Sequence, residues 1–225
     1  MDCSIKCIVH PAMDPTRAVK GILLVDDDPV VCKTTGELIV HGIPDAFLVC
    51  AESPDEALEL CRCLSFDLAI SDIGLPGMMG YELIPCIRKL LPSIYIIAMT
   101  GLNEPHVIYR TGHSRPDSFL TKGFEWPVLL KNVKEGLAVS EERRKAVVDA
   151  NGKEANWRRR GVIRELLGLS VRENDISGMR MHALALMKSG KYKTNEVAKY
   201  AGFSSVQKMQ ESLNRLTPTL LEACQ

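Results

Sequence analysis

Five short apolar runs within residues 20–139 constrain the fold of this chain more strongly than any other feature. The runs are GILLVDD, DAFLVCAE, DLAISD, IYIIAMT and DSFLTK. Short apolar runs bounded by turn residues are typical of buried parallel strands. The amphipathic segments between them predict helices over 30–41, 53–64, 81–91, 104–111 and 127–139. This alternation predicts an α/β fold with a doubly wound, five-stranded parallel sheet.

Two of the predicted helices carry clear start signals. Asp28 precedes Pro29, which is most simply an N-cap followed by a proline in the first turn. Ser53 and Pro54 repeat this arrangement, and Glu56 occupies the capping-box position. These signals place the helix starts directly after the first and second predicted strands.

Polar side chains stand where the apolar runs end. Asp26 and Asp27 end the first run, Asp72 the third, Thr100 the fourth and Lys122 the fifth. Because the carboxyl ends of parallel strands meet at one edge of a sheet, we expect these side chains to converge. Three neighbouring carboxylates repel one another and need a cation, and Mg²⁺ suits an all-oxygen site.

Such a site offers Asp72 a chemical role. A carboxylate can attack phosphorus and form an acyl phosphate, while Lys122 supplies a positive charge to the phosphoryl oxygens. Each residue also has a plainer explanation, since strand-end carboxylates, Thr-Gly turns and surface lysines are common. The combination of all of them, at successive strand ends, favours phosphoryl chemistry.

The segments ILLVDDDPVV, DLAISDIGLPGMMGYEL, IIAMTG and SFLTK resemble the receiver domain of two-component response regulators. The resemblance implies a flavodoxin-like fold, a Mg²⁺ cofactor and a histidine kinase as phosphodonor. It assigns Asp72 as phosphoacceptor and metal ligand. It further assigns Asp26 and Asp27 as the acidic pair, the Gly74 carbonyl as a metal ligand, Thr100 as the switch hydroxyl, Phe119 as the switch aromatic and Lys122 as the phosphate-sensing lysine.

Two features depart from that family's pattern. Gly123 follows Lys122, where the family usually has a proline. The segment YRTGHSRPDSFL lacks the usual Gly-Ala pair before the fifth strand, so an atypical surface for signalling or dimerisation is expected there.

Charge divides the chain into unlike halves. The 28 basic and 28 acidic side chains cancel overall, but residues 151–225 hold 13 basic and 7 acidic ones. We therefore expect an N-terminal extension (1–19), a receiver domain (20–139), a helical linker (140–168) and a basic helix-turn-helix domain (169–225). Opposed charges of this kind indicate modules with different partners, the basic one being suited to nucleic acid.

The segment EVAKYAGFSSVQKMQESLNRLTP predicts two short helices joined near Gly202. It resembles the second helix-turn-helix of AraC-type regulators, from Met179 onward. Apolar anchors recur at Val206, Met209 and Leu213, which leaves a polar face able to contact DNA. The candidate DNA-binding residues on that face are Ser204, Ser205, Gln207, Lys208, Glu211 and Arg215. Arg158–Arg160 could add phosphate contacts, and Trp157 is a packing anchor in this interpretation. An ordinary helical hairpin that binds another protein is the alternative.

The remaining features point away from other classes. No apolar segment is long enough to cross a membrane and no signal peptide is evident, so a cytoplasmic location is expected. The 8 cysteines lie mostly in apolar segments, including Cys32, Cys50, Cys61 and Cys86, and are expected to be reduced and buried. Residues 140–225 show no catalytic motif, so we expect no enzyme. The sequence thus predicts a homodimeric response regulator that is phosphorylated on Asp72 and controls transcription by binding DNA. The alternative is an adaptor whose C-terminal helices bind protein.

Overall fold

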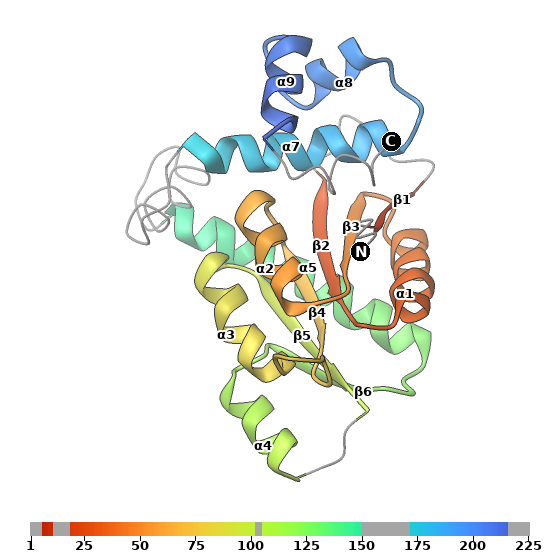
Figure 1. The fold of residues 1–225 in the computed structure, drawn as a ribbon, viewed down its shortest axis with the longest axis vertical. Helices are drawn as coiled ribbons and strands as arrows, with labels where there is room; N and C mark the ends of the chain where they lie inside the picture. The colour runs from red at the N-terminus through yellow and green to blue at the C-terminus, as the bar shows by residue number, and fades with distance from the viewer. Residues whose placement is uncertain (1–5, 11–18, 102–104, 150–171, 216–225) are drawn as a thin grey trace.

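The computed structural model describes residues 6–10, 19–101, 105–149 and 172–215. A twisted sheet forms the centre, helices cover both of its faces, and three further helices lie beyond one end (Figure 1). The six strands are β1 (Lys6–Val9), β2 (Lys20–Val25), β3 (Ala46–Ala51), β4 (Leu68–Asp72), β5 (Tyr95–Thr100) and β6 (Ser118–Thr121).

Strands β2 to β6 are mutually parallel and correspond to the five predicted runs. Their order across the sheet is β3-β2-β4-β5-β6. Taken as five strands, this is the second-first-third-fourth-fifth order of flavodoxin-like folds, so the predicted architecture is confirmed for this part of the chain.

The prediction of a five-stranded, wholly parallel sheet was wrong at one edge. The N-terminal strand β1 pairs antiparallel with β3, with Cys7 opposite Val49, which makes the sheet six-stranded and mixed. Its Ile8 packs against α1, where a Cβ atom placed on Gly36 would lie 2.5 Å from Ile8 Cδ1. Strand β1 therefore covers the backbone groups that β3 would otherwise expose.

Five helices accompany the parallel strands, as predicted. They are α1 (Pro29–Gly42), α2 (Pro54–Cys63), α3 (Gly80–Leu90), α4 (Pro105–His113) and α5 (Trp126–Asp149). Both start signals are confirmed, because the Asp28 carboxylate accepts from the Val30 amide and the Ser53 hydroxyl from the Glu56 amide. Only α5 differs clearly, since it continues ten residues past the predicted end at 139.

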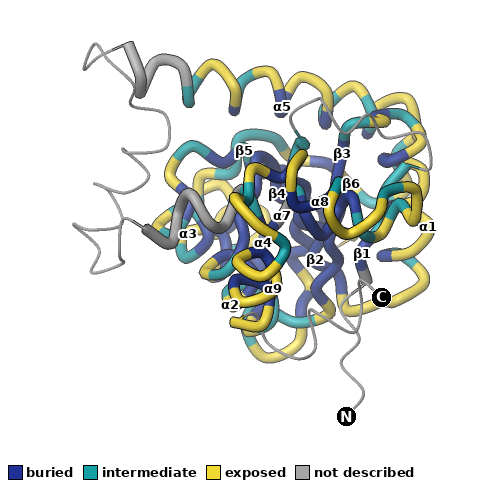
Figure 2. Tube along the Cα trace, turned by 90° about the horizontal axis from the view of Figure 1, so that it is seen from above, coloured by how far each residue is buried: buried dark blue, intermediate teal, exposed yellow. Residues whose placement is uncertain are grey.

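The alternation of side chains along β2 divides the core into two layers. Leu23 and Val25 belong to the apolar cluster on the side of α2 and α3. Ile22 and Leu24 belong to the cluster on the side of α1 and α5. The inner strands β2 to β5 are buried on both sides, as the dark tube at the centre of Figure 2 shows.

The cysteines follow the prediction in part. Cys32, Cys50 and Cys61 are free and buried, whereas Cys86 on α3 is only partly buried. Its sulfhydryl donates to the Glu82 carbonyl one turn earlier. Among the described residues no helix is long and apolar enough to cross a membrane.

The last three helices are α7 (Arg172–Lys188), α8 (Thr194–Tyr200) and α9 (Val206–Leu213). Four consecutive residues of α7, Ala183 to Leu186, are fully buried. Successive helical residues point about 100° apart, so a helix buried at four in a row is covered on all sides. Helices α8 and α9 cover one side and β1 contacts another, which makes α7 the junction between the sheet and the C-terminal helices.

Candidate functional site

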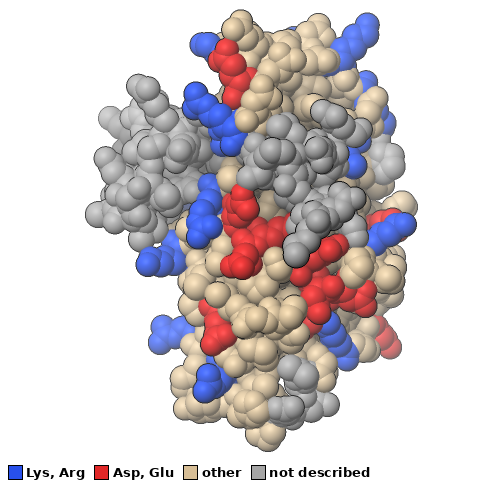
Figure 3. Space-filling view, in the orientation of Figure 1, with Lys and Arg blue, Asp and Glu red and all other residues tan. Residues whose placement is uncertain are grey.

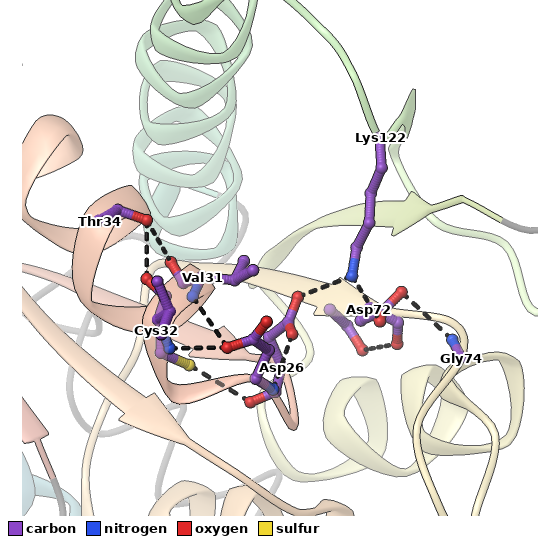
Figure 4. Close-up of polar contacts among 10 residues, drawn as sticks. Asp26, Val31, Cys32, Thr34, Asp72, Gly74 and Lys122 are labelled. Carbon is purple, nitrogen blue, oxygen red and sulfur yellow. Dashed lines mark hydrogen bonds and ion pairs between the residues drawn. The ribbon is translucent and has the colours of Figure 1, made fainter.

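The predicted site residues meet at the carboxyl edge of the sheet. Asp26 directly follows β2, Asp72 is the last residue of β4, and Lys122 directly follows β6. The Lys122 Nζ atom donates to Asp26 Oδ2 at 3.0 Å and to Asp72 Oδ2 at 2.8 Å. Figure 4 shows the lysine reaching between the two carboxylates. Side chains up to 96 positions apart in the sequence thus share one set of charges.

The third carboxylate completes an acidic cluster. One oxygen each of Asp26, Asp27 and Asp72 can be chosen so that all lie within 4.8 Å of one another. Asp26 and Asp72 are buried, whereas Asp27 is exposed. The cluster is therefore open to solvent on one side and closed on the other.

Burial has a direct electrostatic consequence for Asp26. Loss of solvent raises the pKa of this carboxyl group, and the hydrogen bonds from Lys122 and the Asp28 amide only partly offset that effect. For Lys122 burial acts to lower the pKa, but the hydrogen bonds to Asp72 and Asp26 outweigh it and raise the pKa. The lysine is therefore held in its charged form, and one positive charge faces three carboxylates.

This donor set fits a hard divalent cation. Three carboxylate oxygens in close range, one of them exposed, can bind Mg²⁺ while leaving coordination positions for water and phosphate. The Lys122 ammonium alone leaves excess negative charge at a buried position. The residues present are thus consistent with the expected Mg²⁺ cofactor.

Backbone geometry fixes the position of Asp72. The Gly74 amide donates to Asp72 Oδ1 at 3.2 Å, and the loop turns at Gly77, whose φ is +81°. At the start of α3, a Cβ atom on Gly80 would lie 2.1 Å from the Asp72 carbonyl oxygen. Only glycine permits this approach, so the glycines of the segment DLAISDIGLPGMMGYEL bring the loop back against the strand end.

The end of β6 is positioned without the family's usual proline. The Lys122 amide donates to the Thr100 carbonyl at 2.7 Å, which continues the pairing of β5 and β6. Gly123 follows with φ +99°, a left-handed conformation that glycine adopts without strain. A glycine turn therefore directs the Lys122 side chain into the site.

The two expected switch residues occupy different environments. Thr100 ends β5 and is buried, beside the Lys122 strand end. Phe119 lies on edge strand β6 and is 40% exposed. Thr100 is thus next to the acidic cluster, whereas the Phe119 ring lies at the protein surface.

Two further groups hold Asp26 and were not identified from the sequence. The Asp28 amide donates to Asp26 Oδ1 at 3.1 Å, so Asp28 supports the site as well as capping α1. The Cys32 sulfhydryl donates to the Asp26 carbonyl at 3.3 Å. Asp28 follows Asp26 by only two residues, so the sequence could have indicated its contact. Cys32 lies six residues after Asp26 and beyond the start of α1, so the sequence could not have indicated the second contact.

The C-terminal helices show the expected packing in part, because the anchors Met209 and Leu213 are buried whereas Val206 is only partly buried. Val197, Ala198, Ala201, Met209 and Leu213 are buried, with Gly202 at φ +84° in the turn between α8 and α9. All six candidate DNA-binding residues on or next to α9 are exposed: Ser204, Ser205, Gln207, Lys208, Glu211 and Arg215.

Some of these polar groups also serve the fold. The Ser205 hydroxyl caps α9 by accepting from the Lys208 amide at 3.2 Å. Gln207 Nε2 donates to Glu211 Oε1 at 3.0 Å along the helix. Lys208 and Arg215 are the cations of the set. Arg158–Arg160 and Trp157 lie outside the described residues.

The family model of the response regulator receiver domain matches residues 22–134, half of the chain. The chain belongs to the response regulator receiver domain family. The match contains every residue of the acidic site. It ends within α5 and does not include the C-terminal helices.

Relatives of this receiver include regulators from bacteria and plants. The nitrate/nitrite response regulator NarL of Escherichia coli K12 is 27% identical over 156 residues, which are 69% of this chain and 72% of NarL. The two-component response regulator ORR1 of Oryza sativa subsp. japonica is 30% identical over 121 residues, 49% of this chain and 52% of ORR1. The chain thus spans about half the length of the rice relative.

One relative is an enzyme. A cyclic di-GMP phosphodiesterase of Thermotoga maritima is 26% identical over 101 residues, which are 45% of this chain but only 26% of that protein. The other relatives named above are regulators.

Solved structures agree on the receiver fold. A CheY-like receiver domain protein from Methanospirillum hungatei JF-1 aligns with TM-score 0.51 and 28% identity over 55% of this chain and 98% of its own. The receiver domain of an HD domain-containing protein from Pseudomonas fluorescens Pf-5 gives TM-score 0.52 and 27% identity, over 55% and 98%.

The raised pKa of Asp26 generates a prediction about stability. A carboxyl group whose folded pKa is raised stabilises the fold below its unfolded pKa, and this contribution is lost as pH rises through the folded value. At pH 7 without Mg²⁺, Asp26→Asn should therefore raise the unfolding temperature, because the amide leaves no charge to be buried. Differential scanning calorimetry in chelator measures it.

Mg²⁺ and acid provide the controls. Added Mg²⁺ should raise the unfolding temperature of the wild type more than that of the variant, since the variant lacks a ligand. The difference in chelator should shrink below pH 3.8, where both side chains are neutral. A variant less stable than the wild type at pH 7 in chelator would contradict the electrostatic account.

Proposed function

We propose that this chain is a phosphorylation-dependent response regulator that accepts a phosphoryl group on Asp72 from a histidine kinase. The observation that carries the proposal is the Lys122 ammonium, which bonds both to Asp72 and to Asp26 across three strands. An ammonium group that contacts a strand-end carboxylate, with two more carboxylates nearby, can stabilise the negative charge of a phosphoryl group transferred to that carboxylate. Membership of the receiver family supports the same function.

In the transfer, a carboxylate oxygen of Asp72 attacks phosphorus. A P–O bond forms to Asp72, and the bond between phosphorus and the kinase histidine nitrogen breaks, leaving the electron pair on nitrogen. The contact from the Gly74 amide to Asp72 Oδ1 holds the carboxylate in a fixed orientation during the attack. The tight approach of Gly80 keeps the strand end from moving away.

Two residues would stabilise the product. Lys122 can exchange its contact with Asp72 for one with a phosphoryl oxygen while it retains Asp26, which compensates the added charge. Thr100 lies at the adjacent strand end, where its hydroxyl can turn toward the same oxygens. The exposed Phe119 ring can then change position at the surface, which alters the face offered to partners.

Mg²⁺ would be held by Asp26, Asp27, Asp72 and the Gly74 carbonyl. When bound, it would neutralise charge that develops on the phosphoryl oxygens. Asp26 and Asp27 would take no other part in the transfer.

For the output, we propose that α8 and α9 form a helix-turn-helix that binds DNA and so controls transcription. Lys208 and Arg215 lie exposed on or next to α9, beside the polar side chains of Ser204 and Gln207. Such residues can contact phosphates and base edges in a major groove. One motif of this size binds modestly, so we propose a homodimer as the DNA-binding form.

A protein-binding output is the second candidate. The hydrogen bond between Gln207 and Glu211 ties up two of the proposed base-contacting groups, and Glu211 would repel DNA phosphate. These features favour an adaptor in which the same face binds another protein.

Asp72→Asn should abolish phosphate uptake from acetyl phosphate, because the amide nitrogen or oxygen of asparagine cannot form a stable acyl phosphate. Intact-mass spectrometry of the full chain with Mg²⁺ should show the added phosphate in the wild type and none in the variant. Asp55→Asn, an exposed carboxylate on α2, is the matched control and should retain uptake. Uptake by Asp72→Asn at the wild-type rate would overturn the proposal.

Lys208→Ala with Arg215→Ala should weaken binding to genomic DNA fragments at every sequence. The plot of log affinity against log salt should become shallower by about 1 for each lost phosphate contact. Binding by the phosphorylated chain would be measured at two salt concentrations, and Lys131→Ala on α5 is the control. No binding by a wild-type chain that carries phosphate on Asp72 would favour the adaptor instead.

A further inference from the structure

The tail of α5 is attached to the sheet by a series of contacts on one helix face. At Gly136 the helix lies against the sheet, because a Cβ atom there would be 2.5 Å from the Tyr95 ring. One turn later the Ser140 hydroxyl donates to the Ser93 carbonyl at 3.2 Å. Arg143 and Arg144 follow after another turn, on the same side of the helix. The attachment thus continues beyond the family match, which ends at 134.

Arg143 connects two strand starts. Its Nη1 atom donates to the Ile94 carbonyl, next to β5, at 3.2 Å. Its Nη2 atom donates to Asp117 Oδ1, next to β6, at 2.5 Å. The guanidinium carbon also lies 5.7 Å from the centre of the Tyr95 ring, within the range of a cation–π contact.

Asp117 is bound from several directions. Arg88 of α3 donates to its second carboxylate oxygen at 2.8 Å, and so does the Ile96 amide. Burial alone would raise the pKa of Asp117, but the bonds from Arg143 and Arg88 outweigh it and lower the pKa. The carboxylate therefore stays charged throughout the neutral range and holds both arginines.

Arg144 connects to a third strand start. It donates to Asp67 Oδ1, directly before β4, in a close ion pair. The other Asp67 oxygen accepts from the Gly21 amide of β2 at 2.9 Å. Asp67 is buried, so the ion pair with Arg144 compensates a carboxylate that solvent reaches poorly.

These contacts define a clamp formed by Arg143 and Arg144 of α5 with Asp117 and Asp67. It joins α5 to the amino ends of β4, β5 and β6. The carboxyl ends of the same three strands carry Asp72, Thr100 and Lys122. Each strand is only four to six residues long and is paired along its length. Each strand therefore connects the clamp to the acidic site through one short, paired segment.

We propose that this clamp makes Arg143 and Arg144 positioning residues, which hold the α5 tail (140–149) on the sheet and transmit the phosphorylation state of Asp72 to it. The transmission rests on the proposed function. The tail leads directly into the segment before the C-terminal helices. The clamp is thereby a structural route from the acidic site to the output, separate from the surface around Phe119.

The test is hydrogen exchange of backbone amides in residues 140–149 of the full chain. It compares the wild type with the double variant Arg143→Met/Arg144→Met, with and without acetyl phosphate and Mg²⁺. Lys131→Met is the matched control, because it removes a cation of the same helix whose ion pair, with Glu135, is exposed. Intact mass reports phosphate on Asp72 in each sample.

In the wild type and the control, the backbone amides of residues 140–149 should exchange slowly. Phosphorylation of Asp72 should change their exchange rates about threefold or more. The double variant should take up phosphate normally, exchange roughly tenfold faster in the tail, and show no response to phosphorylation. Arg144→Met alone, which leaves Asp117 with both of its arginines, should give an intermediate result if the double variant does not fold.

Unchanged tail protection in the variants would overturn the clamp. An equal response to phosphorylation in the wild type and the variants, or no response in a phosphorylated wild type, would overturn the transmission. A wild type that takes up no phosphate would instead contradict the proposed function. In that case the exchange rates of residues 140–149 in the wild type and the variants would still test the clamp.

Discussion

The contact of one lysine with two carboxylates is the interaction on which the rest of the structure depends. Lys122 bonds to Asp26 and Asp72 only because a parallel sheet delivers the ends of β2, β4 and β6 to the same edge. Burial makes the Asp26 carboxylate costly, and that cost is consistent with a site that gains stability when it binds a cation or compensates a phosphoryl group. Figure 3 shows acidic side chains gathered across the middle of the view, whereas basic side chains are spread over the C-terminal helices and both sides.

The opposite edge of the sheet also carries carboxylates beside strand ends, but there they hold the fold together. There Asp67 and Asp117 are also strand-end carboxylates, but arginines on α5 and α3 form ion pairs with them. A carboxylate with full partners stabilises the fold, whereas a carboxylate cluster with one shared ammonium is prepared for chemistry. The two edges of the sheet thus differ in how completely their charges are paired.

Most of the receiver fold and its acidic site could be predicted because they follow local patterns. Apolar runs ending in Asp26, Asp72 or Lys122 mark a strand and its functional end together. Two parts escaped prediction for identifiable reasons. Strand β1 is a four-residue segment whose contacts with β3, α1 and α7 all lie more than 25 residues away in the sequence. The α5 tail lies within the predicted helical linker (140–168), but its attachment to the sheet by Arg143 and Arg144 depends on distant carboxylates that no periodicity reveals.

The central claim is that Asp26, Asp27, Asp72 and Lys122 form one phosphoacceptor site. A crystal structure of the full chain grown with Mg²⁺ and beryllofluoride, a mimic of a phosphoryl group, would test it most directly. The account predicts the beryllofluoride group on a carboxylate oxygen of Asp72. It also predicts a cation bound by Asp26, Asp27 and Asp72, and Lys122 moved from Asp72 to a fluorine atom. A structure in which Asp72 is unmodified and still paired with Lys122, or in which the cation binds elsewhere, would contradict it.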